Sequence, residues 1–228
     1  AKDIGCLIMQ HAEDSELARN GMINSGIIAS KLGLSGIPEI AERILIERDL
    51  TLLEKAKCRY HISQLSSQNS VDVIKQRKER IKFTSGVSIN NLSLNENDIG
   101  DFRTFLKLSP PLRTEEDRVA LVQGLKEELI DVIVSDHKPE DEESKRLTFS
   151  QAATGASGIE TLLSLSLELY HNGSLKLETI IKALTSNPAK ILKINKGNLS
   201  IGNDADFCIV DIDKPWIVKK EKLVSKSK

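Results

Sequence analysis

The chain has 228 residues, 39% of them apolar and 29% charged, so it can bury a core and is not disordered by composition. Its 32 basic and 33 acidic residues give a net charge of −1. This balance excludes the strong positive charge that marks proteins of nucleic acids or anionic membrane surfaces. The length predicts one large domain, or one and a half.

The cysteines and the chain ends indicate the compartment and the extent of the protein. Cys6, Cys58 and Cys208 lie far apart and form no CxxC motif, which is typical of reduced thiols in the cytoplasm. No stretch approaches the roughly 20 apolar residues of a membrane helix, and no signal peptide is visible. The chain begins without methionine, directly on a strand-like run, so we expect it to be part of a longer protein.

Short apolar runs alternate with longer amphipathic stretches along the first 135 residues. Runs of the first kind predict buried strands, and stretches with apolar residues at helical spacing predict helices. Thr114, followed by three acidic residues, is expected to cap one helix, and Asn69 or Ser70 to cap another. The predicted strands are residues 4–10, 58–65, 81–87 and 131–135, and the predicted helices between them begin near residues 38, 69 and 114.

This order of elements predicts an α/β fold with four parallel strands joined by right-handed crossovers. Four such units are half of a (β/α)8 barrel, and a half barrel leaves open sheet edges. The missing half is therefore expected before Ala1. After the fourth predicted strand come further predicted helices, and then a change in the spacing of apolar residues that predicts a β-hairpin. We expect helices over residues 158–171, 177–183 and 188–192, a hairpin over 197–211, and a division into a half barrel (1–195) and a small β appendage (196–228).

Polar side chains of one chemical kind lie at the predicted strand ends. The first strand runs into His11, the second contains His61, and the fourth ends at Asp136 and His137. In a barrel the carboxyl ends of the strands form the active site. Imidazole nitrogens are neutral ligands for Zn²⁺, and a carboxylate beside them can hold a metal-bound water and take its proton. These residues therefore predict the site of a zinc hydrolase.

Each of these side chains also has a structural alternative. A single histidine such as His11 is often only hydrogen-bonded, and Asp136 can cap the turn that follows it. His61 alternates with an apolar neighbour, which in this alternative directs it away from the barrel. His171, in a turn after a helix, is interpreted as structural. The acidic residues 140–143 and the lysines near the C-terminus are interpreted as solvated.

Several short strings occur together and in a fixed order: HAED at residues 11–14, RYHISQLS at 59–66, LSPPLRTEEDR at 108–118, VSDHKP at 134–139 and TSNPAKIL at 185–192. In this order they resemble dihydroorotase, a family of the metal-dependent amidohydrolase superfamily, over essentially the whole chain. The resemblance implies a (β/α)8 TIM barrel with a flanking β-sandwich, of which residues 196–228 would be a part. It also implies the reversible cyclisation of N-carbamoyl-L-aspartate to dihydroorotate in pyrimidine biosynthesis, with Zn²⁺ as the cofactor.

The resemblance assigns roles to individual positions. His11 matches the family's histidine ligand on the fifth barrel strand. Asp136 matches the eighth-strand aspartate, which contacts the metal and acts as the general base. Gln64 stands where the family has a second histidine ligand, and a neutral amide oxygen is a poor ligand for Zn²⁺ beside imidazole. The remaining metal ligands of the family would lie in the missing half.

Three positions that bind substrate in the family also differ from its pattern. Ser109 replaces an asparagine that contacts the substrate, and Asn90 lies where the family has Pro-His-His and this chain has Ile-Asn-Asn. Glu140 replaces a histidine that helps to bind the substrate carboxylate, and a carboxylate there repels a dianionic substrate. Together with Gln64, these changes imply catalysis that is weakened or lost.

Functions of different classes follow from this pattern. The first is a dihydroorotase with a reduced metal site that uses His11 and Asp136. The second is a non-catalytic, dihydroorotase-like chain that serves as a structural partner of aspartate transcarbamoylase, as the resemblance implies for inactive members. A third is another cyclic-amide hydrolase, such as a hydantoinase or allantoinase relative, although LSPPLR argues against it. We expect a cytoplasmic homo-oligomer with a small-molecule substrate and with neither nucleic acid nor a membrane as partner.

Overall fold

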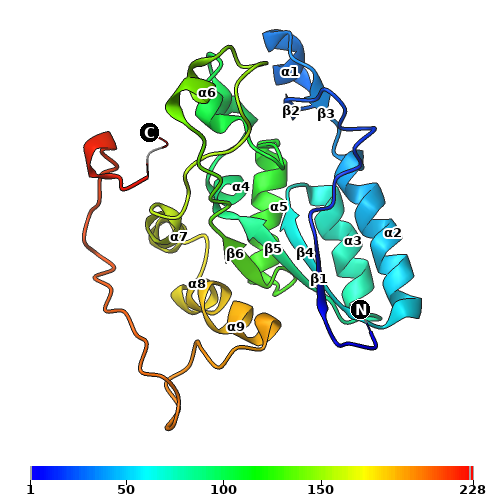
Figure 1. Ribbon diagram of the computed structural model, residues 1–228, viewed down its shortest axis with the longest axis vertical. Coiled ribbons are helices and arrows are strands. Elements are labelled where there is room, and N and C mark those ends of the chain that lie inside the picture. Colours follow the sequence, from blue (N-terminus) through cyan, green and yellow to red (C-terminus); the bar gives the residue numbers. More distant parts are fainter. Residues whose placement is uncertain (1, 226, 228) are drawn as a thin grey trace.

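Four parallel strands form the main sheet, in the spatial order β1, β4, β5, β6 (Figure 1). The computed structural model describes residues 2–225 and residue 227. All three strand pairings are parallel, so the predicted parallel sheet is confirmed. The first strand begins later than expected, because the residues before it form a turn. The strands are β1 (Leu7–Gln10), β4 (Arg59–Leu65), β5 (Thr84–Ser88) and β6 (Val132–Val134).

Three helices cover one face of this sheet: α2 (Ile40–Ala56), α3 (Gln68–Lys78) and α5 (Glu115–Lys126) (Figure 1). Between helices and sheet lies the largest apolar core, which holds side chains from each layer. Burial of one such side chain contributes about 1.5–3 kcal/mol, so this layer is the main source of stability. Members from the three helices and the two central strands are Ile46, Leu50, Ile62, Ile74, Val87 and Leu121.

Of the two predicted N-terminal helix caps, one is confirmed and one is wrong. Thr114 caps α5 as predicted, and Asp117 bonds back to the Thr114 amide in a capping box. The cap of α3 is Ser67, whose hydroxyl accepts a hydrogen bond from the Ser70 amide at 3.2 Å. The prediction of Asn69 or Ser70 is therefore wrong. The strand before α3 ends at Leu65, as predicted, but only Ser66 and Ser67 separate it from the helix.

After β6 the chain forms α7 (Leu162–His171), α8 (Leu177–Leu184) and α9 (Ser186–Leu192). These helices lie beside β6, away from α2 and α3 (Figure 1). The last helix begins earlier than predicted, so Pro188 is its third residue rather than its first. Proline is tolerated there because the amides of the first helical turn have no partner within the helix.

The β-hairpin predicted over residues 197–211 is wrong. None of these residues belongs to a strand, and Ile201, Phe207 and Ile209 are exposed. In Figure 1 this segment runs as an extended chain from α9 toward the C-terminus. A strand needs a neighbour that bonds its main chain, and this segment has none within the part of the chain that the structure describes. The division at residue 195 stays a prediction.

The remaining elements are short, and the sequence did not predict them. A small two-stranded parallel sheet lies beside α1, and single helical turns follow β5 and β6. No described helix has the length and apolar character required to cross a membrane. These short elements are β2 (Ile23–Asn24), α1 (Ile27–Leu32), β3 (Gly36–Ile37), α4 (Ile89–Ser93), α6 (Glu142–Arg146) and the 3-10 helices Glu96–Ile99, Thr104–Leu106 and Lys220–Lys222.

Candidate functional site

Two candidate residues from different strands meet directly. Gln64 Nε2 donates a hydrogen bond to Asp136 Oδ1 at 2.7 Å, across 72 residues of sequence. The pairing of β4 with β5 shifts register between Ile62 and Leu65, and Gln64 lies within this irregular stretch. Asp136 follows β6 with a φ of +48°, a left-handed conformation that Asp adopts more readily than most residues. The two backbones thus bring an amide and a carboxylate together at the carboxyl end of the sheet.

A second polar pair lies at the end of β1. His11 Nε2 is 3.3 Å from Ser109 Oγ, within hydrogen-bonding distance. His11 is exposed, and Ser109 precedes Pro110 through a cis peptide bond. The pair joins the end of the first strand to the LSPPLR segment, as the resemblance implied for two residues of one site.

The environment of Asp136 favours its protonated form. Burial raises the pKa of the Asp136 carboxyl above its ordinary value, while the Gln64 hydrogen bond and the positive charges of His11 and Lys138 act to lower the same pKa. A carboxylate whose pKa is raised by burial is a better proton acceptor than a solvated one.

The other histidines have structural contacts. His137 Nδ1 accepts hydrogen bonds from the amides of Gly158 (3.2 Å) and Ile159 (3.3 Å), so this nitrogen holds a loop. His171 Nε2 lies 2.8 Å from the Ile212 carbonyl oxygen, which agrees with its structural interpretation. The carboxylate and imidazole that end the fourth strand therefore serve different purposes.

The alternative that directs His61 away from the barrel is wrong. Its neighbours Tyr60 and Ile62 belong to the core with the outer helices, and Tyr60 Oη bonds to Asp49 of α2 at 2.6 Å. Since side chains alternate along a strand, His61 lies on the opposite, inner face. There its Nδ1 is 2.8 Å from Thr84 Oγ1, and burial lowers the pKa of the imidazole.

Two further candidate residues stand apart from these pairs. The Glu140 carboxylate lies 3.8 Å from Lys138 Nζ, and its amide donates to Ser227 Oγ at 3.2 Å. Asn90 is buried in α4, directly after β5, and its Nδ2 lacks a hydrogen-bond partner among the described residues. Neither residue forms a hydrogen bond with Gln64, Asp136 or His11 in the described chain, so their substrate contacts stay predictions.

Directly behind the strand ends lies a buried polar network that the sequence reasoning missed. Glu42 of α2 accepts a hydrogen bond from the Ser66 amide at 3.1 Å and another from the Ser66 hydroxyl. Arg113 Nε donates to the same hydroxyl at 3.0 Å. Arg113 Nη1 donates to Asn24 Oδ1 and to the Ile37 carbonyl, both at 2.8 Å. The network joins α2, β4, the small sheet and the LSPPLR segment.

The sequence held one signal for this network. Arg113 belongs to LSPPLR, the string that carried much of the resemblance, yet it received no role there. Glu42 gave no signal, because a glutamate in the first turn of a helix is ordinarily solvated. In the structure only 2% of Glu42 and 3% of Arg113 is exposed. Residues that position a site are thus invisible until the helices are packed.

Comparison with known sequences decides the family. Residues 1–227 match the amidohydrolase family. The chain belongs to this family. It is 45% identical to a dihydroorotase of Ehrlichia chaffeensis and 40% identical to one of Anaplasma phagocytophilum, over 97% and 100% of this chain. The alignments cover 50% and 52% of those proteins, so this amidohydrolase chain spans about half the length of the curated relatives it matches.

Solved structures of similar fold include proteins named dihydropyrimidinase and hydantoinase. A dihydropyrimidinase from Brevibacillus agri superposes with a TM-score of 0.76 at 23% identity, which supports the fold alone. An L-hydantoinase from Arthrobacter aurescens gives 0.76 at 28% identity. Each covers 90% of this chain, which covers 48% of each of them. The four parallel strands are accordingly part of an amidohydrolase barrel.

The donor set of this amidohydrolase chain does not by itself fit a zinc ion. No group of three His, Cys, Asp or Glu side chains that could hold a metal occurs among residues 2–225 and 227. His11 and Asp136 are two donors, whereas catalytic zinc sites use three protein ligands. The Gln64 amide turns its NH₂ group toward Asp136, and an NH₂ group cannot bind a metal cation.

Proposed function

We propose that this chain is the C-terminal half of a dihydroorotase-family barrel that acts in pyrimidine metabolism. The substrate would be dihydroorotate, a cyclic amide in reversible exchange with N-carbamoyl-L-aspartate. The similarity to relatives named dihydroorotase supports this role. The observation that carries it is the place of His11 and Asp136 just after β1 and β6, at the carboxyl ends of the strands, where barrel enzymes bind substrate. The protein would be a cytoplasmic homo-oligomer without a nucleic-acid or membrane partner.

In this proposal Asp136 is the proton acceptor. Its Oδ1 is held by the Gln64 amide, which leaves Oδ2 for a proton from the reacting water. Ser109 would orient the ring amide by a hydrogen bond, and His11 would be a metal ligand. Zn²⁺, which the resemblance implies, needs ligands beyond those of the described residues and, when bound, would supply the activation of water.

We infer that the catalysis of this site is weak. The Gln64 NH₂ group occupies a carboxylate oxygen that the family's pattern leaves to the metal. Glu140 would add negative charge where the dianionic substrate needs a donor. The first feature disfavours the metal, and the second disfavours the substrate.

A second candidate function is that of a non-catalytic structural partner of aspartate transcarbamoylase. The observation that favours it is the contrast between the altered reactive positions and the fully bonded buried network around Arg113 and Glu42. A chain kept for its shape needs that network but does not need the ligands. A hydantoinase-like activity is the third candidate.

The experiment is a turnover assay of the full-length protein with added zinc, with dihydroorotate and hydantoin as separate substrates and with metal content measured on the same sample. Turnover of dihydroorotate that disappears in Asp136→Asn supports the proposal. Turnover of hydantoin alone supports the third candidate. Absence of both turnover and metal, with aspartate transcarbamoylase bound to the purified protein, supports the structural partner.

A further inference from the structure

Two lysine side chains are buried near the loops that follow the strand ends. Only 7% of Lys107 and 1% of Lys145 is exposed. Neither ammonium group forms an ion pair with a carboxylate of the described chain; each donates to main-chain carbonyl oxygens instead. Burying an ammonium group without hydrogen bonds is costly, so these carbonyl oxygens are what make the burial possible.

Lys107 is bonded to the first part of one loop. Its Nζ donates to the carbonyl oxygens of Phe149 (2.9 Å), Ser150 (3.0 Å) and Ala152 (2.8 Å). The same Nζ lies 5.9 Å from the centre of the Phe149 ring, at a distance where a cation is attracted to an aromatic face. All three ammonium hydrogens of Lys107 thus have a partner in this loop.

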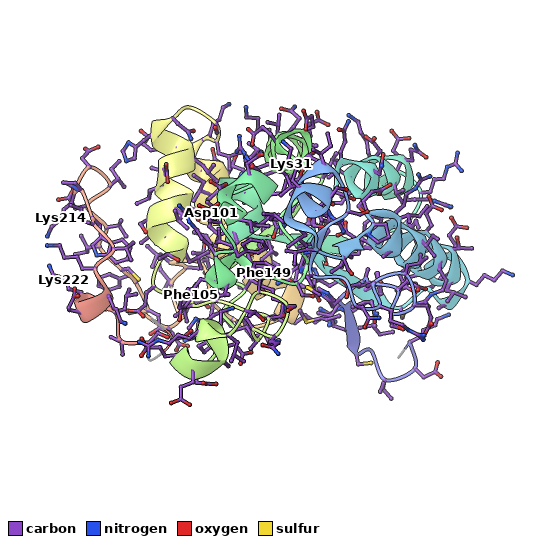
Figure 2. All side chains as sticks on the ribbon, turned by 90° about the horizontal axis from the view of Figure 1, so that it is seen from above. Lys31, Asp101, Phe105, Phe149, Lys214 and Lys222 are labelled. Atoms are coloured by element: carbon purple, nitrogen blue, oxygen red, sulfur yellow. The ribbon has the colours of Figure 1, made fainter. Side chains whose placement is uncertain are left out.

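Lys145 is bonded to the rest of the loop. Its Nζ donates to the carbonyl oxygens of Ala153 and Gly155, both at 2.8 Å, and lies 5.6 Å from the centre of the Phe105 ring. The side chains of Phe105 and Phe149 lie in the same region of the molecule (Figure 2). Five carbonyl oxygens between residues 149 and 155 therefore converge on two ammonium groups.

The end of this loop is joined to the segment that carries Asp136. The Lys138 amide donates to the Ala156 carbonyl at 2.9 Å, and the Gly158 amide donates to His137 Nδ1 at 3.2 Å. At Gly158 an added Cβ would lie 2.1 Å from the Ser135 carbonyl oxygen, so the two segments are in close contact. The loop thus contacts Ser135 on one side of Asp136, and His137 and Lys138 on the other side.

We propose that Lys107 and Lys145 are positioning residues that hold the 149–158 loop through its carbonyl oxygens and thereby fix Asp136 at the strand end. The dependence is mutual, because the carbonyl oxygens would be buried without donors if the lysines were absent. The two ammonium groups act as internal cations around which the loop is built. The importance of the position of Asp136 rests on the proposed function, whereas the clamp itself does not.

The test compares hydrogen–deuterium exchange of the full-length protein with that of its Lys107→Met and Lys145→Met variants. Methionine retains most of the side-chain volume but removes the charge and the donors. We expect amides of residues 137–138 and 155–158 to exchange about tenfold faster or more, with unchanged exchange in β4 and β5. Lys138→Met is the matched control, because 63% of that side chain is exposed in the same segment, and it should change neither region. Unchanged exchange at 137–138 in both buried-lysine variants would overturn the proposal.

A second measurement covers variants that fail to fold. In the unaltered protein with ¹⁵N-labelled lysine, the ammonium hydrogens of Lys107 and Lys145 should exchange slowly with water, unlike those of Lys138. Fast exchange at both buried positions would contradict the clamp. Neither measurement uses turnover, so loss of the proposed enzymatic function would leave this result unaffected, and the reverse also holds.

Discussion

The strand-end site and the network behind it differ in how completely they are bonded. At the strand ends the exposed His11 and the half-buried Gln64 each have one hydrogen bond to another candidate residue. Behind them, Arg113 and Glu42 are almost fully buried and bond to partners in three different segments, namely Ser66 after β4, Asn24 of β2 and Ile37 of β3. The strand-end residues have open bonding capacity for a ligand, whereas the network supports the geometry of the strand ends. The packing that supports a site and the groups that would react in it can therefore be altered separately by substitution.

The largest effect is expected from Arg113→Met. It removes three hydrogen bonds and leaves the Ser66 hydroxyl, Asn24 Oδ1 and the Ile37 carbonyl oxygen without their charged donor. Removing one charged member of a buried set costs about 3–5 kcal/mol of unfolding free energy. Urea denaturation of the full-length protein measures the loss. Arg19→Ala, which removes an exposed ion pair with Glu16, is the control and should cost under about 1 kcal/mol. Equal losses in the two variants would contradict the role of the network.

A smaller loss is expected from Glu42→Gln. The amide oxygen can still accept from Ser66, so the packing is kept, but one of the two charged groups of the network is lost. The cost should be about 1–3 kcal/mol, below that of Arg113→Met. The same urea series tests this order, and a Glu42→Gln loss above that of Arg113→Met would show that the carboxylate dominates.

Gln64→His should change the strand-end site without changing the network. An imidazole in place of the amide adds a nitrogen ligand beside His11 and Asp136, so zinc affinity of the full-length protein should rise about tenfold or more, which is about 1.4 kcal/mol. Zinc content after dialysis measures the change. Gln64→Leu is the control and should bind no more zinc than the unaltered protein. Equal zinc in the two variants would mean that the loss of the site extends beyond this one ligand.

The smallest effect concerns pH. Burial lowers the pKa of His61 in the folded state, although Asp131 acts to raise it. The unfolded chain therefore binds more protons than the folded chain between the lowered folded pKa and the unfolded pKa of about 6.5, and stability falls as the pH decreases through that window. The slope from this one group cannot exceed about 1.4 kcal/mol per pH unit. Unfolding free energies at several pH values should show a shallower decline in His61→Gln, and an unchanged slope would refute this assignment.

The sequence predicted the sheet because its signal is local. Parallel strands buried on both faces appear as continuous apolar runs, and β4 and β5 occur close to where such runs lie. The hairpin over residues 197–211 had a similar run but no neighbouring strand, and pairing cannot be read from one segment. A strand could thus be predicted from its apolar run where it belongs to a sheet covered by helices.

The site was predictable in its residue types and not in its contacts. Asp136 and His11 were found from their place at strand ends, but the Gln64–Asp136 hydrogen bond depends on a register shift in β4 that no pattern indicates. Lys107 and Lys145 were missed for the opposite reason. A lysine in a sequence predicts an exposed side chain. Only the folded loop reveals that its carbonyl oxygens surround these two ammonium groups.

The sheet has a further consequence for the protein in the cell. Within the described residues β1 and β6 each pair with one strand only, and Ile8 and Met9 of β1 are exposed. Each outer edge therefore presents a row of main-chain donors and acceptors that can recruit β-segments of other chains. Until these edges are covered, the polypeptide is a target for chaperones and for self-association at high concentration. Its yield as a folded protein would then depend on how quickly the edges are covered, rather than on anything at the strand-end site.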